Sequence, residues 1–259
     1  MPREGHSLPL KLPAYSLIST FEAILACLNC NRVISSLSTN DFGLDKSKKA
    51  FLELCESIKA LIEYLCIEKE TEIIEEYGFE TNRNAKKLHN QLIDKLKESN
   101  SNIHALCNLA DAYKHREINR ADRVINSTDQ LVEMPTIVRF EDDSGYYYSW
   151  MKVLEIRKNN GVRLLAFNEM LTSSRQVLRQ CIKFGIIDKL PKTEPYCPFV
   201  QREDCTSEYL YETYEGEGLE IEHNKGIFDK NENTLRNVLA SDEFNTELNI
   251  KLIVKPSII

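Results

Sequence analysis

Glycine and tryptophan are scarce in this sequence, with nine glycines and one tryptophan among 259 residues. A phosphate-binding loop needs several glycines, because its backbone approaches the phosphate closely in conformations that other residues rarely adopt. No such loop is present, and neither is an HExxH zinc motif or a nucleophile elbow. The sequence therefore does not favour a nucleotide-binding α/β fold, a zinc peptidase or a serine hydrolase.

Long apolar runs are absent as well. No run reaches the roughly 18 apolar residues that a membrane span requires, so we expect no membrane association. Residues 1–17 lack the apolar core of a signal peptide, because Lys11 and two prolines interrupt it. We therefore expect a cytoplasmic protein.

Eight cysteines in a chain of this length do not indicate a disulfide scaffold. Five lie in apolar helical patterns, where a free cysteine behaves as a small apolar residue: Cys27, Cys55, Cys66, Cys107 and Cys181. The CxxC at Cys27 and Cys30 has no second pair that would complete a zinc site. We expect no metal and no cofactor.

The net charge of −7 is unevenly distributed. Residues 191–259 carry seven Lys and Arg against fourteen Asp and Glu, so residues 1–190 carry 26 of each sign and are neutral. We expect a first unit over 1–190 and an acidic extension over 191–259. An acidic segment repels nucleic acid and attracts basic surfaces, which suggests a docking or self-masking role.

Apolar residues recur at three-to-four spacing through the first half of the chain, which is typical of amphipathic helices. The predicted helices span residues 16–37, 46–77, 81–98 and 102–122. Gly78 stands where a C-terminal cap glycine is expected. Four such helices joined by short polar loops predict an antiparallel bundle.

The pattern changes to alternation after residue 128, which predicts an insertion of β-strands at 135–167. Pro135 introduces the first strand, 136–140, and the others are 146–156 and 162–167, followed by a closing helix at 168–187. In the extension we expect strands at 219–222 and 247–254 around a short helix at 231–240. The predicted fold class is α+β.

A polar stripe lies on the fourth helix. His104, Asn108, Asp111 and His115 fall within about 60° of one another on a helical projection, and the buried side is expected roughly opposite. Because His104 and His115 are about 16 Å apart along the axis, they cannot share one metal ion. Asp111 and His115 form the possible catalytic pair; the alternative is a solvated or interhelical polar face.

The segment Asp111-Ala112-Tyr113-Lys114-His115, with Asn108 one turn earlier, resembles an Asp-x-x-Lys-His element of HEPN-like bacterial helical proteins. The stretch from Arg83 to His89 is similar to the Arg-x5-His motif of HEPN ribonucleases. This resemblance implies metal-independent RNA cleavage at a dimer interface, with His89 in proton transfer and Arg83 on the scissile phosphate.

The residues themselves also allow a simpler interpretation. His89 lies among apolar residues of the predicted third helix, and Arg83 would point about 120° away on a continuous helix. A core or interface histidine is therefore the alternative, and the face bearing His89 is the expected dimer contact.

A small basic group offers candidate RNA contacts: Lys114, Arg116 and Arg120, with Arg123 nearby. Interleaved acidic residues weaken this footprint. Two functions remain open. One is a HEPN-like RNA-cleaving or RNA-binding effector, in bacterial antiviral defence or a toxin system. The other is a non-catalytic protein–protein interaction module that forms a homodimer or docks a partner protein.

Overall fold

The computed structural model describes residues 44–80, 85–100, 102–115, 123–190, 219–221, 224–229, 234–238, 242 and 252–254. These residues form helices and a β-sheet, which confirms the predicted α+β class. The predicted helix at 16–37 and three site candidates, Arg83, Arg116 and Arg120, lie outside the described residues.

The helix predicted at 46–77 is two helices in the structure, α3 (Leu44–Glu68) and α4 (Glu70–Tyr77). The expectation of one helix was wrong because Lys69 leaves the helical region, with φ −128° and ψ 33°. Gly78 ends α4 in the left-handed conformation, with φ +64°, and its N–H donates to the carbonyl of Ile74. The expected glycine cap is confirmed.

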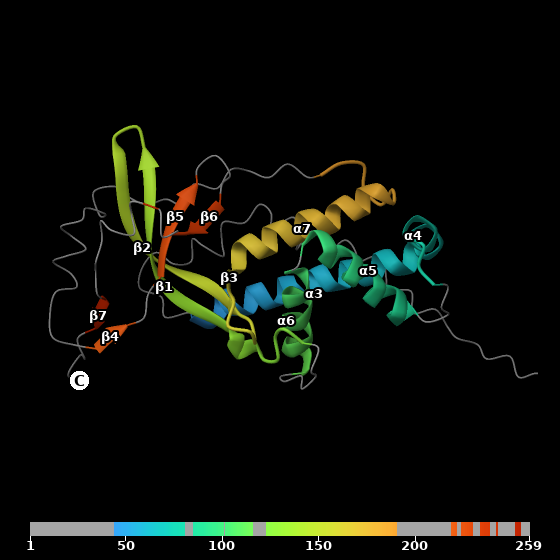
Figure 1. The fold of residues 1–259 in the computed structure, drawn as a ribbon, viewed down its shortest axis with the longest axis horizontal. Helices are drawn as coiled ribbons and strands as arrows, with labels where there is room; N and C mark the ends of the chain where they lie inside the picture. The colour runs from blue at the N-terminus through green and yellow to red at the C-terminus, as the bar shows by residue number, and fades with distance from the viewer. Residues whose placement is uncertain are drawn as a thin grey trace, which may run out of the picture.

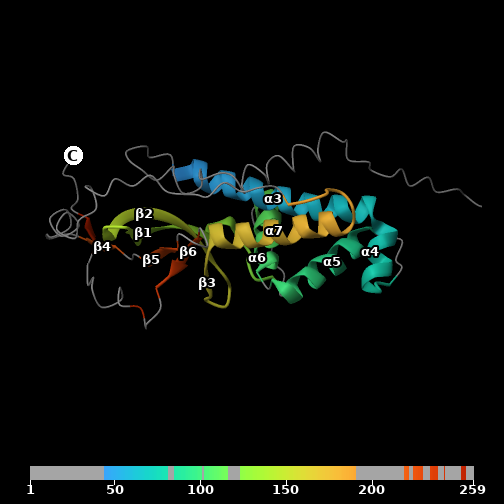
Figure 2. The ribbon, with the colours of Figure 1, turned by 90° about the horizontal axis from the view of Figure 1, so that it is seen from above.

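Helices α5 (Ala85–Ser99) and α6 (Ile103–His115) follow, and α7 (Ala166–Lys183) returns after the strands. Helix α3 packs against α5, α6 and α7, and both views show α3 and α7 side by side (Figures 1 and 2). One continuous apolar core joins these helices to the base of the sheet. None of the described helices combines the length and apolar character that crossing a membrane requires.

A long hairpin follows a 3₁₀ turn at Thr128–Gln130. Its strands β1 (Leu131–Asp142) and β2 (Gly145–Arg157) pair in one unbroken antiparallel register, from Leu131 opposite Ile156 to Asp142 opposite Gly145. Figure 1 shows this hairpin extending away from the helices.

Pro135 lies inside β1 rather than before it, so the expected start of the strand was wrong. At this position the described strands place only β2 beside β1, because the other neighbour, β5 (Asn224–Asp229), begins pairing at Thr136. A proline is tolerated where one side of a strand carries no ladder.

Strand β3 (Arg163–Leu165) is shorter than predicted because α7 begins at Ala166, and α7 ends at Lys183, earlier than expected. The turn before β3 contains Gly161 in the left-handed region, at φ +81°.

Two strands from beyond residue 190 join the same sheet, whose order is β3-β2-β1-β5-β6. Strand β6 (Thr234–Asn237) falls where we expected a short helix, so that expectation was wrong. The reason is tertiary: β6 pairs with β5, and Leu235 is buried in a second apolar cluster with Val138 and Phe140 of the hairpin. A separate pair, β4 (Leu219–Ile221) and β7 (Leu252–Val254), lies near the expected strands.

Candidate functional site

Helix α6 carries the predicted polar stripe, and most of this helix is buried. Asn108, in the middle of the stripe, is only 1% exposed. The expectation that the buried side lies opposite the stripe was therefore wrong. Small residues surround Asn108 on this helix, including Ala105, Cys107 and Ala112, and they allow neighbouring elements to approach α6 on several sides.

Asn108 holds the chain that enters the hairpin. Its Oδ1 accepts hydrogen bonds from the backbone N–H groups of Val124, at 3.0 Å, and Ile125, at 3.4 Å. Buried backbone donors need such partners, because leaving one unpaired costs about 1–3 kcal/mol. Asn108 therefore has a structural role in joining α6 to the sheet.

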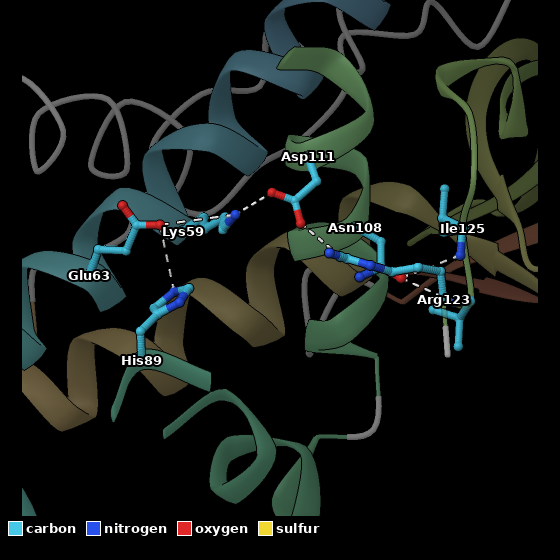
Figure 3. A network of polar contacts seen from close by, with 8 residues as sticks. Lys59, Glu63, His89, Asn108, Asp111, Arg123 and Ile125 are labelled. Atoms are coloured by element: carbon cyan, nitrogen blue, oxygen red, sulfur yellow. Dashed lines mark hydrogen bonds and ion pairs between the residues drawn. The ribbon is translucent and has the colours of Figure 1, made fainter. Parts of the chain in front are cut away.

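Asp111 lies between two cations (Figure 3). Lys59 of α3 contacts Oδ1, and Nη1 of Arg123 donates to Oδ2 at 2.7 Å. Burial alone would raise the pKa of Asp111, but the bonds and charges of Lys59 and Arg123 outweigh it and lower the pKa below its usual value. Asp111 is thus an ionised carboxylate with both oxygens engaged.

The carboxylate of Asp111 does not form the predicted catalytic pair with His115. Its contacts reach across to α3 and to the segment before the hairpin, whereas His115 is exposed one turn further along α6. The attraction of two cations from other elements fixes the carboxylate's orientation.

His89 of α5 is 6% exposed, and its Nε2 lies 3.9 Å from Oε1 of Glu63 on α3. Burial, followed by the charge of Lys59, lowers the pKa of His89 to about 4, although Asp111 acts in the opposite direction. His89 is therefore neutral at pH 7. The interpretation as a core histidine is confirmed.

Because His89 is buried within a single chain, the expected dimer contact through its face was wrong. The side chain is enclosed by α3 and α5 of its own chain, where Leu88 and Leu92 are also buried.

Alternating charges connect α3 to its neighbours. Glu56 pairs with Lys114 at 3.3 Å, Lys59 contacts Asp111, and Glu63 lies 4.0 Å from Lys59 and faces His89. Cys107 lies within the reach of these charges, yet burial raises the pKa of its thiol to about 12. This cysteine is protonated and inaccessible, so it is not a nucleophile.

The structure thus gathers His89 and Asp111 around Lys59 and leaves Lys114 and His115 at the exposed end of α6. Sequence reasoning missed Lys59 and Glu63, and it counted Arg123 only as part of a basic group. The only sequence signal of Lys59 and Glu63 is their position at the edge of the apolar stripe of α3, and many solvated residues share such a position.

Within the described part of the chain, no group of three or more His, Cys, Asp or Glu side chains could hold a metal ion. Comparison with protein-family models, with curated proteins and with solved structures gave no match for this chain.

Proposed function

We propose that this protein is a non-catalytic protein–protein interaction module. The observation that carries the proposal is the engagement of its best acid–base candidates in a buried ion network. His89 is enclosed and neutral, and both carboxylate oxygens of Asp111 contact cations.

General acid–base catalysis requires a group that reaches the substrate and has a pKa near the working pH. His89 meets neither condition, because its side chain is buried and its pKa lies near 4. Asp111 is held ionised by Lys59 and Arg123 and points toward them. These groups support packing between helices rather than chemistry.

A second candidate, the HEPN-like RNA effector, draws support from the end of α6. Lys114 and His115 are exposed there, next to each other, as a phosphate contact and an accessible imidazole would have to be. Under this hypothesis the reaction takes place at His115, and His89 contributes only through folding.

The test is RNA degradation by the purified chain without divalent metal, compared with His115→Ala and His89→Ala. The interaction module predicts no cleavage by any of the three proteins. Cleavage that is lost in His115→Ala, with unchanged thermal stability, would establish the RNA effector instead. Cleavage that is equal in all three proteins would indicate a contaminating nuclease and is checked with a second purification.

A further inference from the structure

Strands β5 and β6 cover the outer edge of β1, although they come from beyond residue 190. Strand β5 pairs with β1 in parallel over four described positions, 136–139 of β1 against 224–227 of β5. Parallel pairing is slightly less stable per residue than antiparallel pairing. Figure 1 shows both strands alongside the hairpin. The cover of this edge is therefore short and comes from a distant part of the sequence.

The two strands belong to the smaller of two apolar clusters. The main core joins the helices to the base of the sheet and, as far as the chain is described, contains no side chain of β5 or β6. Leu235 of β6 is buried instead with Val138 and Phe140 of β1, and a hydrogen bond from Nδ2 of Asn168 on α7 to its carbonyl fastens β6. A unit outside the main core opens at a lower free energy than the whole fold, so these strands can separate while the helices stay folded.

The contacts of the two strands define what this edge selects. Nδ2 of Asn224 donates to Oε2 of Glu155 at 3.0 Å, and this carboxylate side chain is only 5% exposed. A Cβ added at Gly226 would lie 2.9 Å from Cδ1 of Leu235, so β5 needs glycine there. The ring of Phe228 packs on that of Phe140, with centres 5.5 Å apart. A fitting segment therefore has an amide donor, a glycine two residues later, and then an aliphatic and an aromatic residue.

We propose that the outer edge of β1 is a strand-binding site that the chain masks with its own β5 and β6. The partner is a protein with an extended segment of the same pattern, which displaces the mask and pairs with β1. Addition of a strand to a sheet edge is a common mode of peptide recognition. The proposal deepens the proposed function and rests on it, since it names the binding edge and the segment that controls access to it.

The covalent link between the mask and its site sets the concentration at which a partner displaces the mask. A segment joined to its own site competes at an effective concentration on the order of a millimolar. A free segment of equal affinity therefore half-saturates the wild type only near that concentration. A chain whose mask cannot bind takes up the free segment at its intrinsic affinity.

The experiment measures binding of a labelled synthetic peptide, with the sequence of residues 222–238, to the full chain by fluorescence anisotropy. Leu235→Asp places a carboxylate in the apolar cluster and displaces the mask, so this variant should bind the peptide at least about tenfold more tightly than wild type. The matched control is Asn237→Asp, the same new charge at an exposed position of β6, which should bind like wild type. A peptide that itself carries Leu235→Asp should bind to none of the proteins.

A milder variant and amide exchange make the test independent of one substitution. Asn224→Ala removes the hydrogen bond to Glu155 and should give a peptide affinity between those of wild type and Leu235→Asp. In the wild type, the hydrogen-bonded amides of β5 and β6 should exchange together and faster than those of α3.

Equal peptide binding by wild type and Leu235→Asp, or exchange of β5 and β6 only through global unfolding, would overturn the mask and leave the proposed function standing. Loss of the helices in Leu235→Asp, measured by circular dichroism, would show that the strands are inseparable from the fold and would likewise overturn it. RNA cleavage that depends on His115 would overturn the proposed function and leave the peptide measurement unaffected.

Discussion

The helical part and the hairpin use their charged residues in opposite ways. In the helical part, Lys59 and Arg123 each contact Asp111, and all three side chains are only 14–16% exposed. On the hairpin tip, Glu141 and Asp143 are exposed. Charges that a fold needs for its own cohesion are enclosed, whereas those at the tip remain accessible to another molecule. Substitutions should therefore affect stability in the first region and association in the second.

The largest expected effect is in the helical part. Asp111→Ala would leave Lys59 and Arg123 mostly buried without their shared anion. Loss of one partner from such a network should lower the free energy of unfolding by about 3 kcal/mol. Urea denaturation measures this change. Asp94→Ala, at an exposed position on α5, is the control and should stay within about 0.5 kcal/mol of wild type. Equal effects would show that the network does not stabilise the fold.

The next effect is a pH dependence from His89. The pKa of this side chain is about 4 in the folded chain, against 6.5 for an unperturbed histidine, so the unfolded chain binds more protons between these values. Stability is therefore complete above pH 6.5 and falls as the pH decreases toward 4, by roughly 3 kcal/mol.

Urea midpoints from pH 7 to pH 4 measure this dependence. His89→Gln should show a shallower decline than wild type over that range, whereas the exposed His115→Gln should follow the wild type. Parallel curves for all three proteins would contradict the assignment to His89.

The smallest effect is expected on the hairpin. Tyr146 is 48% exposed, and the guanidinium of Arg139 lies 4.3 Å from the centre of its ring. Tyr146→Ala removes this contact and should cost less than about 1 kcal/mol, because exposed cation–π pairs are weak. Thermal melting measures the change. A loss as large as that of Asp111→Ala would remove the distinction between the two regions.

Strong local periodicity explains which elements the sequence could predict. The apolar stripes of α5 and α7 and the alternation in β2 are readable because each repeats over many residues. The break at Lys69 has no comparable signal, since neither proline nor glycine stands there. Strand β6 is four residues long and depends on pairing with β5, so only the tertiary fold specifies it.

In the candidate site, too, local patterns could be predicted from the sequence and contacts between distant residues could not. The apolar neighbours of His89 indicated a core position, and the structure confirms it. Lys59 contacts Asp111 although 52 residues of sequence separate them. A single sequence does not show which residues so far apart come into contact. Without knowledge of that contact, the i and i+4 spacing made His115 the nearest candidate partner of Asp111, and this choice was wrong.

The alternating charges of α3 and α6 have one more consequence, for the alignment of the two helices. Glu56 with Lys114 and Lys59 with Asp111 define an antiparallel register. Sliding α6 by one turn in one direction would bring Lys114 to Lys59 and Asp111 to Glu63; sliding it in the other would bring Asp111 to Glu56. Both shifts place like charges together in a poorly hydrated interface, where they repel each other strongly. The ion pairs therefore disfavour the shifted alignments of the two helices as well as stabilising the observed alignment.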